Sequence, residues 1–370
     1  MLKKAPEREN RRMVDTGGVD ALISHASPWL SLRHKTGIVI SSRVRLARNV
    51  RGHFFPGWAG EAERVRICQE IKEACYSLER LPQPLYFDMG TLDHVDKEVL
   101  KERRLISNEL AQRGTGSAVM ASADERIAIM INEEDHLRLQ AILPGMNLAE
   151  AWTLIDGIDS EMESYLEYEF SQKLGYVTAC PSNLGTALRA SVMLHLPGLK
   201  LADEVGPVIN GLERIGFAVR GVEGEGTEAH GNLFQVSNQM SLGETEADII
   251  ERLVQVVSEI ERHEENARLR LLESRRAFLL DQIGRALGIL LYARVLASRE
   301  ALDLLSGVRL GIELGLVRNV DVGTVNELLL LTQPGHLQRL SGQKLSAEER
   351  DELRAQVIGQ RLKGAGLKGA

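Results

Sequence analysis

Apolar positions recur along the chain with two different periods, which separates helical from extended stretches. In residues 61–79 apolar side chains fall every three or four positions, as on the buried face of an amphipathic helix, and 92–112 and 147–174 repeat this period. Short apolar runs bounded by glycine or polar residues predict strands instead. These runs cover residues 36–41, 126–132, 176–180, 189–196, 216–220 and 233–238.

The order of these elements predicts an α+β fold followed by a helical region. Strands joined by short glycine-containing loops favour a mainly antiparallel sheet with helices packed on one face. After about residue 244 only helical periods remain, in 244–273, 276–297, 299–315, 322–331 and 346–361, the last opening with a capping box, Ser346-Ala-Glu-Glu349. We therefore expect an N-terminal segment (1–35), an α+β domain (36–262) and a helical domain (263–370), divided in the charged stretch 261–270.

Composition and charge restrict the classes of partner. The 370 residues are 44% hydrophobic and 26% charged, and no apolar run approaches the length that crosses a bilayer. A net charge of −7 argues against nucleic acid and favours a cationic partner. Three cysteines and the lack of a secretory signal predict a cytoplasmic protein, with Cys68 and Cys75 as core residues and the tail 366–370 disordered.

Three acids follow the apolar run 127–131 closely. They are Glu133, Glu134 and Asp135, within the sequence Asn-Glu-Glu-Asp-His-Leu-Arg. Adjacent carboxylates repel one another unless a cation arrives, so this loop predicts a binding site for a positively charged group. His136, in the same stretch, is expected to make a structural hydrogen bond.

Arginines recur at the ends of the apolar strands and in the loops beside them. Guanidinium groups offer planar, bidentate donors that suit phosphate oxygens, and several together could hold a triphosphate. Any one of them alone could equally be a surface residue with a weak ion pair, but their shared placement favours an anion site. They are Arg43, Arg45, Arg138, Arg189 and Arg220. The chain carries neither a Walker A motif nor the signatures of Ser/Thr/Tyr kinases.

A lone cysteine stands where a strand-like run enters a turn. Cys180 is followed by Pro181, Asn183 and Gly185, residues that favour a loop in which neighbouring cations could stabilise a thiolate. Lone cysteines are more often small buried hydrophobic residues, and this segment alone does not decide between the two roles.

These motifs, taken in order, resemble the catalytic domain of the phosphagen (ATP:guanidino) kinases, the creatine and arginine kinase superfamily. The motifs Ser-Ser-Arg-Val-Arg-Leu-Ala-Arg, Asn-Glu-Glu-Asp-His-Leu-Arg, Cys-Pro-Ser-Asn-Leu-Gly-Thr-Ala-Leu-Arg and the Arg220 loop lie within residues 36–243. Only 40 residues precede Ser41, too few for the N-terminal helical domain of phosphagen kinases. Helices that follow the catalytic domain are similar instead to the bacterial protein-arginine kinases, and residues 350–355 (Arg-Asp-Glu-Leu-Arg-Ala) resemble their phosphoarginine-binding element.

The resemblance implies a role for each motif. Glu134 would be the base that receives a proton from a substrate guanidinium, with Glu133 or Asp135 orienting it or binding magnesium indirectly, and Cys180 beside it as a thiolate. Nucleotide contacts are implied at Ser41, Ser42, Arg43, Val44, Arg45, Arg104, Arg138, Arg189, Ala190, Ser191, Val192, Met193, Arg220, Gly221, Val222, Glu223, Gly224 and Glu225. Phosphoarginine contacts are implied at Arg350, Asp351, Arg354 and Ala355.

Three positions depart from the family pattern. Arg104 stands where the family usually has a nucleotide-contacting histidine, Ala187 where it has a glycine, and Glu223 where an aromatic residue is common. None of these departures removes a phosphate-binding arginine or an acid.

The resemblance also implies an activity, cofactors and partners. The reaction would transfer the γ-phosphoryl group of ATP, with Mg²⁺, to arginines exposed on protein substrates, marking them for degradation in stress response and protein quality control. An activator protein and protease or chaperone machinery are the implied partners, and the apolar C-terminal helices favour a homodimer. Two alternatives remain: a phosphagen kinase for a free guanidino compound, and a catalytically idle phosphoarginine-binding adaptor, which the intact Glu134, Cys180 and five arginines argue against.

Overall fold

The structure is a computed structural model that describes residues 18–23, 25–31, 37–221 and 229–368. Its α-helices are α1 (Gly18–Ile23), α2 (Glu61–Ser77), α3 (His94–Glu102), α4 (Asn108–Ala111), α5 (Leu148–Met162), α6 (Pro197–Leu201), α7 (Val205–Arg214), α8 (Glu246–Ser274), α9 (Arg276–Tyr292), α10 (Ser298–Glu313), α11 (Val322–Leu331), α12 (Pro334–Ser341) and α13 (Ala347–Arg361). Three short 3₁₀ helices are η1 (Pro28–Leu30), η2 (Pro181–Asn183) and η3 (His230–Asn232).

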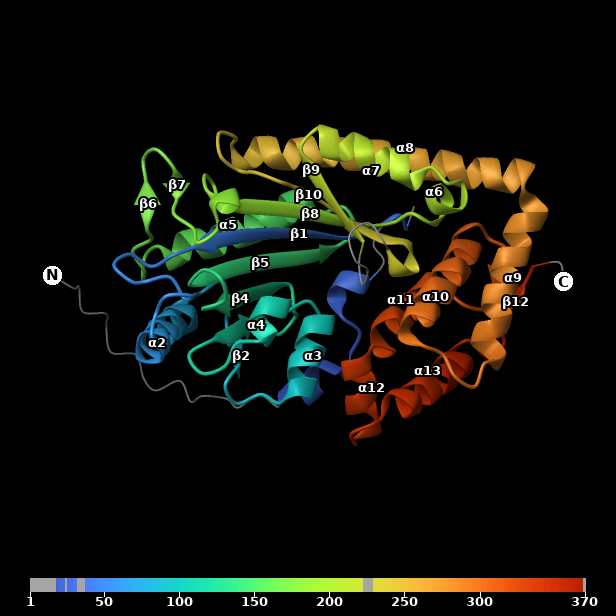
Figure 1. Cartoon of the computed structure of the whole chain (residues 1–370), viewed down its shortest axis with the longest axis horizontal. Coiled ribbons are helices and arrows are strands. Elements are labelled where there is room, and N and C mark those ends of the chain that lie inside the picture. The colour runs from blue at the N-terminus through green and yellow to red at the C-terminus, as the bar shows by residue number, and fades with distance from the viewer. Residues whose placement is uncertain (1–17, 24, 32–36, 222–228, 369–370) are drawn as a thin grey trace.

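An eight-stranded antiparallel sheet forms the centre of the α+β part, as expected (Figure 1). Its spatial order is β2 (Leu85–Asp88), β3 (Ala118–Ala121), β4 (Ile127–Ile131), β5 (Leu137–Pro144), β1 (Val39–Arg48), β8 (Leu188–His195), β10 (Leu233–Asn238) and β9 (Phe217–Gly221). Two small sheets pair β6 (Phe170–Ser171) with β7 (Gly175–Tyr176) and β11 (Val317–Arg318) with β12 (Gly366–Leu367).

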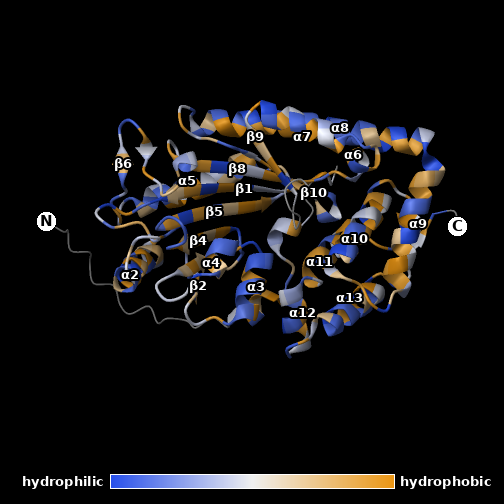
Figure 2. Ribbon diagram, in the orientation of Figure 1, coloured by the Kyte–Doolittle hydropathy of each residue, from blue (hydrophilic) through white to orange (hydrophobic). Residues whose placement is uncertain are grey.

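One face of the sheet packs on helices, because side chains of a strand alternate between its two faces. Val44 and Leu46 of β1 join a core with apolar residues of α2, α5, α7 and α8. Helices α5, α7 and α8 lie along the sheet in Figure 1, and Figure 2 shows the mixed polarity of their surfaces. On the opposite face, β3 and β4 pack against α1 and α3, and the central strands carry polar residues beside a small apolar cluster, which is where the candidate site lies.

Several sequence-based element predictions are confirmed, and others are wrong. The runs 126–132, 189–196, 216–220 and 233–238 are β4, β8, β9 and β10, and Cys68 and Cys75 are buried as expected. The predicted strand 176–180 contributes only Tyr176 to a small hairpin.

Two predicted helices are shorter than their apolar period suggested. The helix expected over 147–174 ends at Met162. The helix expected over 92–112 is divided into α3 and α4, because Arg104 between them adopts a left-handed backbone with φ of 63°. The strand predicted over 36–41 is the start of the longer β1, and β2, β3 and β5 were not predicted.

The boundary expected in residues 261–270 falls inside a continuous helix. Helix α8 runs through this charged stretch without a break, and its residues belong to two different cores. Ala267 closes the core under the sheet, whereas Leu271 opens the core of the helical region. The tail was predicted to be disordered, but Gly366–Leu367 pairs with Val317–Arg318, and residues 369–370 lie outside the described residues. The capping box is present: the Ser346 side chain accepts from the Glu349 amide.

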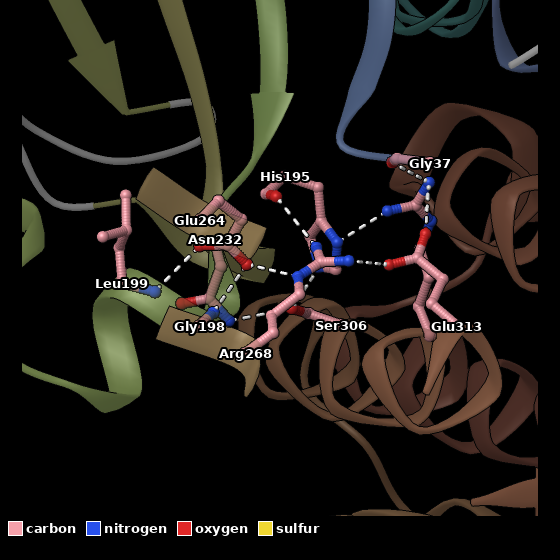
Figure 3. Close-up of polar contacts among 10 residues, drawn as sticks. Gly37, His195, Gly198, Leu199, Asn232, Glu264, Arg268, Ser306 and Glu313 are labelled. Carbon is pink, nitrogen blue, oxygen red and sulfur yellow. Dashed lines mark hydrogen bonds and ion pairs between the residues drawn. The ribbon is translucent and has the colours of Figure 1, made fainter. Parts of the chain in front are cut away.

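A buried polar network joins the helical region to the sheet (Figure 3). Arg309 of α10 donates to Nδ1 of His195 at 2.6 Å and to the carbonyl of Gly37 at 2.6 Å. Arg268 of α8 pairs with Glu264 at 2.6 Å and with Glu313 of α10 at 2.8 Å. Burial and the two arginines lower the pKa of His195 well below its ordinary value, so the ring is neutral and accepts from Arg309. The network holds the end of β8 and the approach to β1 against the helices.

Candidate active site

The five predicted arginines lie on the face of the sheet opposite to Val44 and Leu46. Directly opposed residues of antiparallel strands project to the same face. In this register Arg45 is opposite both Arg189 and Gln140, Arg138 is opposite Ala47, and Arg220 is opposite Gln235. Strand alternation therefore gathers arginines from β1, β5, β8 and β9 over one surface of the sheet, which we call the arginine face.

The arginines are close enough to repel one another. Burial, followed by repulsion from Arg104, Arg138 and Arg189, lowers the pKa of Arg43 to about 9. Burial and the neighbouring arginines lower the pKa of Arg45 well below its ordinary value. Within the described residues, Nε of Arg45 and Nε of Arg189 are buried without a hydrogen-bond partner. A bound polyanion would both neutralise the repulsion and satisfy these donors.

Four residues in the predicted nucleotide-binding runs point away from this surface. Val44, Ala190 and Val192 have fully buried side chains in the core on the other face, and Ser42 donates to the carbonyl of Gly145. Each run was predicted as a continuous set of contacts, but alternate residues of a strand lie on opposite faces of the sheet, so only every second residue can face the arginines. Four further predicted positions, Val222, Glu223, Gly224 and Glu225, lie outside the described residues.

Alternate positions that face the arginines line a small cavity. Arg43 donates to Oε1 of Gln235 at 2.9 Å and lies 3.5 Å from Oγ of Ser191. The guanidinium of Arg104 lies over the ring of Trp29, 4.9 Å from its centroid. The cavity is lined by Ser41, Arg43, Arg104, Ile142, Ser191, Met193 and Gln235. Ser41, Ser191 and Met193, all predicted nucleotide contacts, therefore meet at one place.

The three adjacent acids differ in their partners. Glu133 is buried and binds Arg138, with Nη1 of Arg138 2.6 Å from its Oε2, and Ser107 donates to it as well. Asp135 accepts hydrogen bonds from the Asn49 side chain and the Ala179 amide, each at 2.7 Å. Glu134 is exposed. Partial burial, Asp135 and Glu133 raise the pKa of Glu134, while Arg138 opposes the shift. The chain itself supplies the cation for Glu133, and Glu134 is the carboxylate that faces outward.

Cys180 lies beside the acid loop. The hydrogen bond from the Ala179 amide to Asp135 places the cysteine segment directly against the acids. The thiol is half-buried, 3.0 Å from Oγ of Ser182, and a thiolate there would act on Arg189, whose pKa it would raise against the lowering by burial and Arg220. The Cys180 segment therefore lies beside both the acid loop that carries Glu134 and the sheet surface that carries Arg189.

Residues that hold the acid loop in place were missed by sequence reasoning. Asn49 donates to Asp135 and to the carbonyl of Val177, and its Oδ1 accepts from the His136 amide. His136 has the expected structural role, since its Nδ1 accepts from Val50 and its Nε2 donates to the carbonyl of Phe54. Asn49 follows the arginine-rich strand directly, and that position was the available signal.

Known families match both parts of the chain. Residues 66–267 match the family described as ATP:guanido phosphotransferase, C-terminal catalytic domain, and residues 276–368 match the family described as Protein-arginine kinase McsB C-terminal domain. The protein-arginine kinase of Halalkalibacterium halodurans is 47% identical over 91% of this chain and 95% of its own length. Those of Brevibacillus brevis and Moorella thermoacetica are 44% and 45% identical, covering 91% and 88% of this chain and 96% and 94% of theirs.

The chain belongs to the protein-arginine kinase family. Solved phosphagen kinases share the fold of its catalytic part. Lombricine kinase superposes with a TM-score of 0.55 at 24% identity, over 67% of this chain and 70% of that chain. A duplicated taurocyamine kinase from Schistosoma mansoni with bound transition state analogue components gives a TM-score of 0.57 at 25% identity, over 66% of this chain and 35% of the longer protein.

Two departures from the pattern of this superfamily have a clear geometry. Ala187, in place of the family glycine, has φ of 54°, the left-handed region that glycine adopts without strain. Its carbonyl accepts from the Ala47 amide at 3.2 Å, which ties the cysteine loop to β1. Arg104, in place of the family histidine, lines the cavity beside Arg43. Both substitutions leave the arginine face and the acids in contact.

The predicted phosphoarginine element lies on α13, but its two arginines are not equally available. Arg354 is buried and donates to the carbonyls of Thr332 at 2.8 Å and Leu296 at 2.7 Å, and it also pairs with Asp351. Arg350 is half-buried and donates to the carbonyl of Leu345 at 3.0 Å. Arg354 therefore holds the helices together, and Arg350 is the more accessible guanidinium of the pair.

Proposed function

We propose that this chain transfers the γ-phosphoryl group of ATP to arginine side chains of other proteins. The observation that carries the proposal is the position of Glu134, an exposed carboxylate where the acid loop, the Cys180 loop and the arginine face meet. A guanidinium has a pKa above about 12 and must lose a proton to act as a nucleophile. Glu134 would bind its N–H groups and accept that proton while nitrogen bonds to the γ-phosphorus and the bond from phosphorus to the leaving ADP oxygen breaks.

ATP would lie on the arginine face. Arg43, Arg45, Arg138, Arg189 and Arg220 would spread positive charge over its phosphates, and Arg104 would contact the nucleotide from the cavity. Among the described residues, no group of three or more His, Cys, Asp and Glu side chains could hold a metal ion. Magnesium bound with ATP would supply charge neutralisation at the phosphates, and Glu133 and Asp135 would act on it only indirectly, because their oxygens have protein partners.

A polypeptide substrate is supported by apolar side chains exposed near the acids. The loop that accepts the hydrogen bond from His136 carries Phe54, 67% exposed, and Trp58, 86% exposed. The β6–β7 hairpin, which precedes Cys180, exposes 57% of Phe170. A free guanidino compound has no flanking residues that could contact these exposed apolar side chains, whereas the residues on either side of a target arginine in a protein could pack on them.

The helical region would bind phosphoarginine and respond to it. Arg350, Asp351, Arg354 and Ala355 are the proposed contacts, and Ala355 lines an open groove of about 590 Å³ that also contains Arg294. By resemblance we further propose a homodimer through the helical region (263–370), an activator, and delivery of marked proteins to protease or chaperone machinery in the cytoplasm during stress. Among the described residues, the structure has no helix long and apolar enough to cross a bilayer.

Mass spectrometry under neutral conditions tests the proposed activity, because phosphoarginine is acid-labile. The protein is incubated with ATP and Mg²⁺ and offered either an arginine-bearing protein or free arginine. We expect phosphorylation on protein arginines and little on the free amino acid. Rapid phosphorylation of free arginine alone would favour a phosphagen kinase, and no transfer to any target would favour the adaptor.

A further inference from the structure

The C-terminal end of α3 is bonded to the helical region through one carboxylate. Oε1 of Glu102 accepts from the Gly335 amide at 2.7 Å, and Oε2 accepts from the His336 amide at 3.0 Å and from Nδ1 of His336 at 2.6 Å. The side chains of Glu102 and His336 are only 6% and 1% exposed. A carboxylate at the first turn of a helix satisfies its free amides and its dipole, so Glu102 holds the start of α12 firmly.

Close packing between these helices requires the glycine. A β-carbon at Gly335 would lie 2.9 Å from Oε2 of Glu102 and 2.9 Å from the amide nitrogen of Val99. Real β-carbons do not approach backbone atoms this closely, so any side chain here would push α12 away from α3. The contact therefore depends on both the charge of Glu102 and the shape of Gly335.

Two residues after Glu102, the chain reaches the nucleotide cavity. Arg104 has φ of 63°, a backbone conformation that a residue with a side chain keeps only where its surroundings hold it. Its carbonyl accepts from Gln140 of β5 at 2.8 Å, and its guanidinium lies over Trp29. Glu102 lies two residues before this strained residue, and its bonds to α12 hold the chain there.

The same carboxylate also lies close to Arg354. Burial lowers the pKa of Arg354, and the negative charges of Asp351 and Glu102 oppose this shift. Arg354 donates to the carbonyl of Thr332, two residues before α12 begins. A continuous path of contacts therefore runs from α13 through the start of α12 to the end of α3.

We infer that Glu102 is a positioning residue for nucleotide binding: held by Gly335 and His336 of α12, it fixes Arg104 in the cavity beside Arg43. The helical region thereby sets the affinity for ATP without touching the nucleotide. This inference rests on the proposed assignment of Arg104 to the nucleotide site.

Steady-state kinetics with a matched control test this role in the full-length protein. Glu102→Ala is expected to raise the KM for ATP about tenfold while kcat changes by less than about twofold, because only the placement of Arg104 is altered. Gly335→Ala, which displaces α12 by its shape and not by charge, is expected to act in the same direction. The control is Asp96→Ala, which removes the ion pair of Asp96 with Arg339 between the same two helices but lies six residues before Glu102.

A double-mutant cycle decides whether Glu102 acts through Arg104. In an Arg104→Ala background, Glu102→Ala should raise the KM for ATP no further. Full additivity in this cycle, or an equal effect of Asp96→Ala, would overturn the inference, since either result means general loosening of the interface. If Arg104→Ala alone leaves the KM for ATP unchanged, the nucleotide assignment fails instead. Thermal melting of each variant checks that the fold is retained, and Gly335→Ala serves if Glu102→Ala does not fold.

Discussion

Glu134 differs from its two acidic neighbours in what surrounds it. Glu133 is paired with Arg138, and Asp135 accepts from Asn49 and Ala179, so both are committed to holding the loop. Their charges nevertheless act on Glu134 and raise its pKa together with partial burial. A carboxylate with a raised pKa is a stronger base than an ordinary one, which suits it to accept a proton from a guanidinium.

The pH dependence of the reaction should report this shift. A base works only when deprotonated, so kcat/KM is lost as the pH falls through the pKa of Glu134. Because that pKa is raised, the acid limb should lie above the ordinary glutamate value of 4.5. The profile of kcat/KM between pH 4 and pH 8 measures it, using Asp135→Asn to remove one of the raising charges. An acid limb that does not move downward in Asp135→Asn would contradict the role of the neighbouring charge.

Strand β1 separates two kinds of arginine by its alternation. Arg43 and Arg45 face the surface on which the arginines gather, whereas Arg48 faces the core, where it pairs with Asp159 at 2.6 Å and lies 3.4 Å from the ring centroid of Tyr176. The motif in the sequence does not separate these roles, but the strand register does. We therefore expect Arg45, which lies among like charges, to serve a ligand, and Arg48, which pairs with the buried Asp159, to stabilise the fold.

Substitution of each arginine should therefore have opposite consequences. Arg45→Leu removes a positive charge from the proposed phosphate site, so we expect ATP affinity to fall about tenfold or more. The same substitution relieves repulsion from Arg43, Arg138 and Arg189, so the unfolding free energy should not fall. Arg48→Leu leaves Asp159 buried without its partner, and the unfolding free energy should fall by about 3–5 kcal/mol. Denaturant unfolding and calorimetric titration with ATP measure both quantities. Equal destabilisation by the two variants would refute this division of roles.

Helices and strands were predicted well from the sequence where the spacing of apolar residues was clearly that of one element type. Strands β4, β8, β9 and β10 and the long C-terminal helices were found from their patterns. The divided helix at Arg104 was not, because a left-handed residue with a long side chain depends on tertiary contacts and leaves no local signal. Likewise, the role of Asn49 could not be predicted from the sequence, because its hydrogen bond to Asp135 depends on the folded structure.

At the scale of the whole molecule, the helical region and the sheet are connected by more than a linker. Helix α8 belongs to both cores, Arg309 binds the end of β8 and the segment just before β1, and Glu102 binds the start of α12. The sequence predicted two parts with a boundary between them, since strand-like apolar runs give way to helical apolar periods after about residue 244. It could not predict these contacts, because their partners lie more than sixty residues apart.

The rate of phosphoarginine formation by a Glu134→Gln variant tests the central claim most directly. The amide keeps the size of the side chain but cannot accept the proton, so transfer to a protein arginine should slow by about 10²- to 10⁴-fold. Glu109→Gln, which changes a neighbouring acid on α4 that acts on Glu134 only through its charge, serves as the matched control and should retain most activity. Full transfer by Glu134→Gln, quantified by mass spectrometry under neutral conditions, would contradict the account.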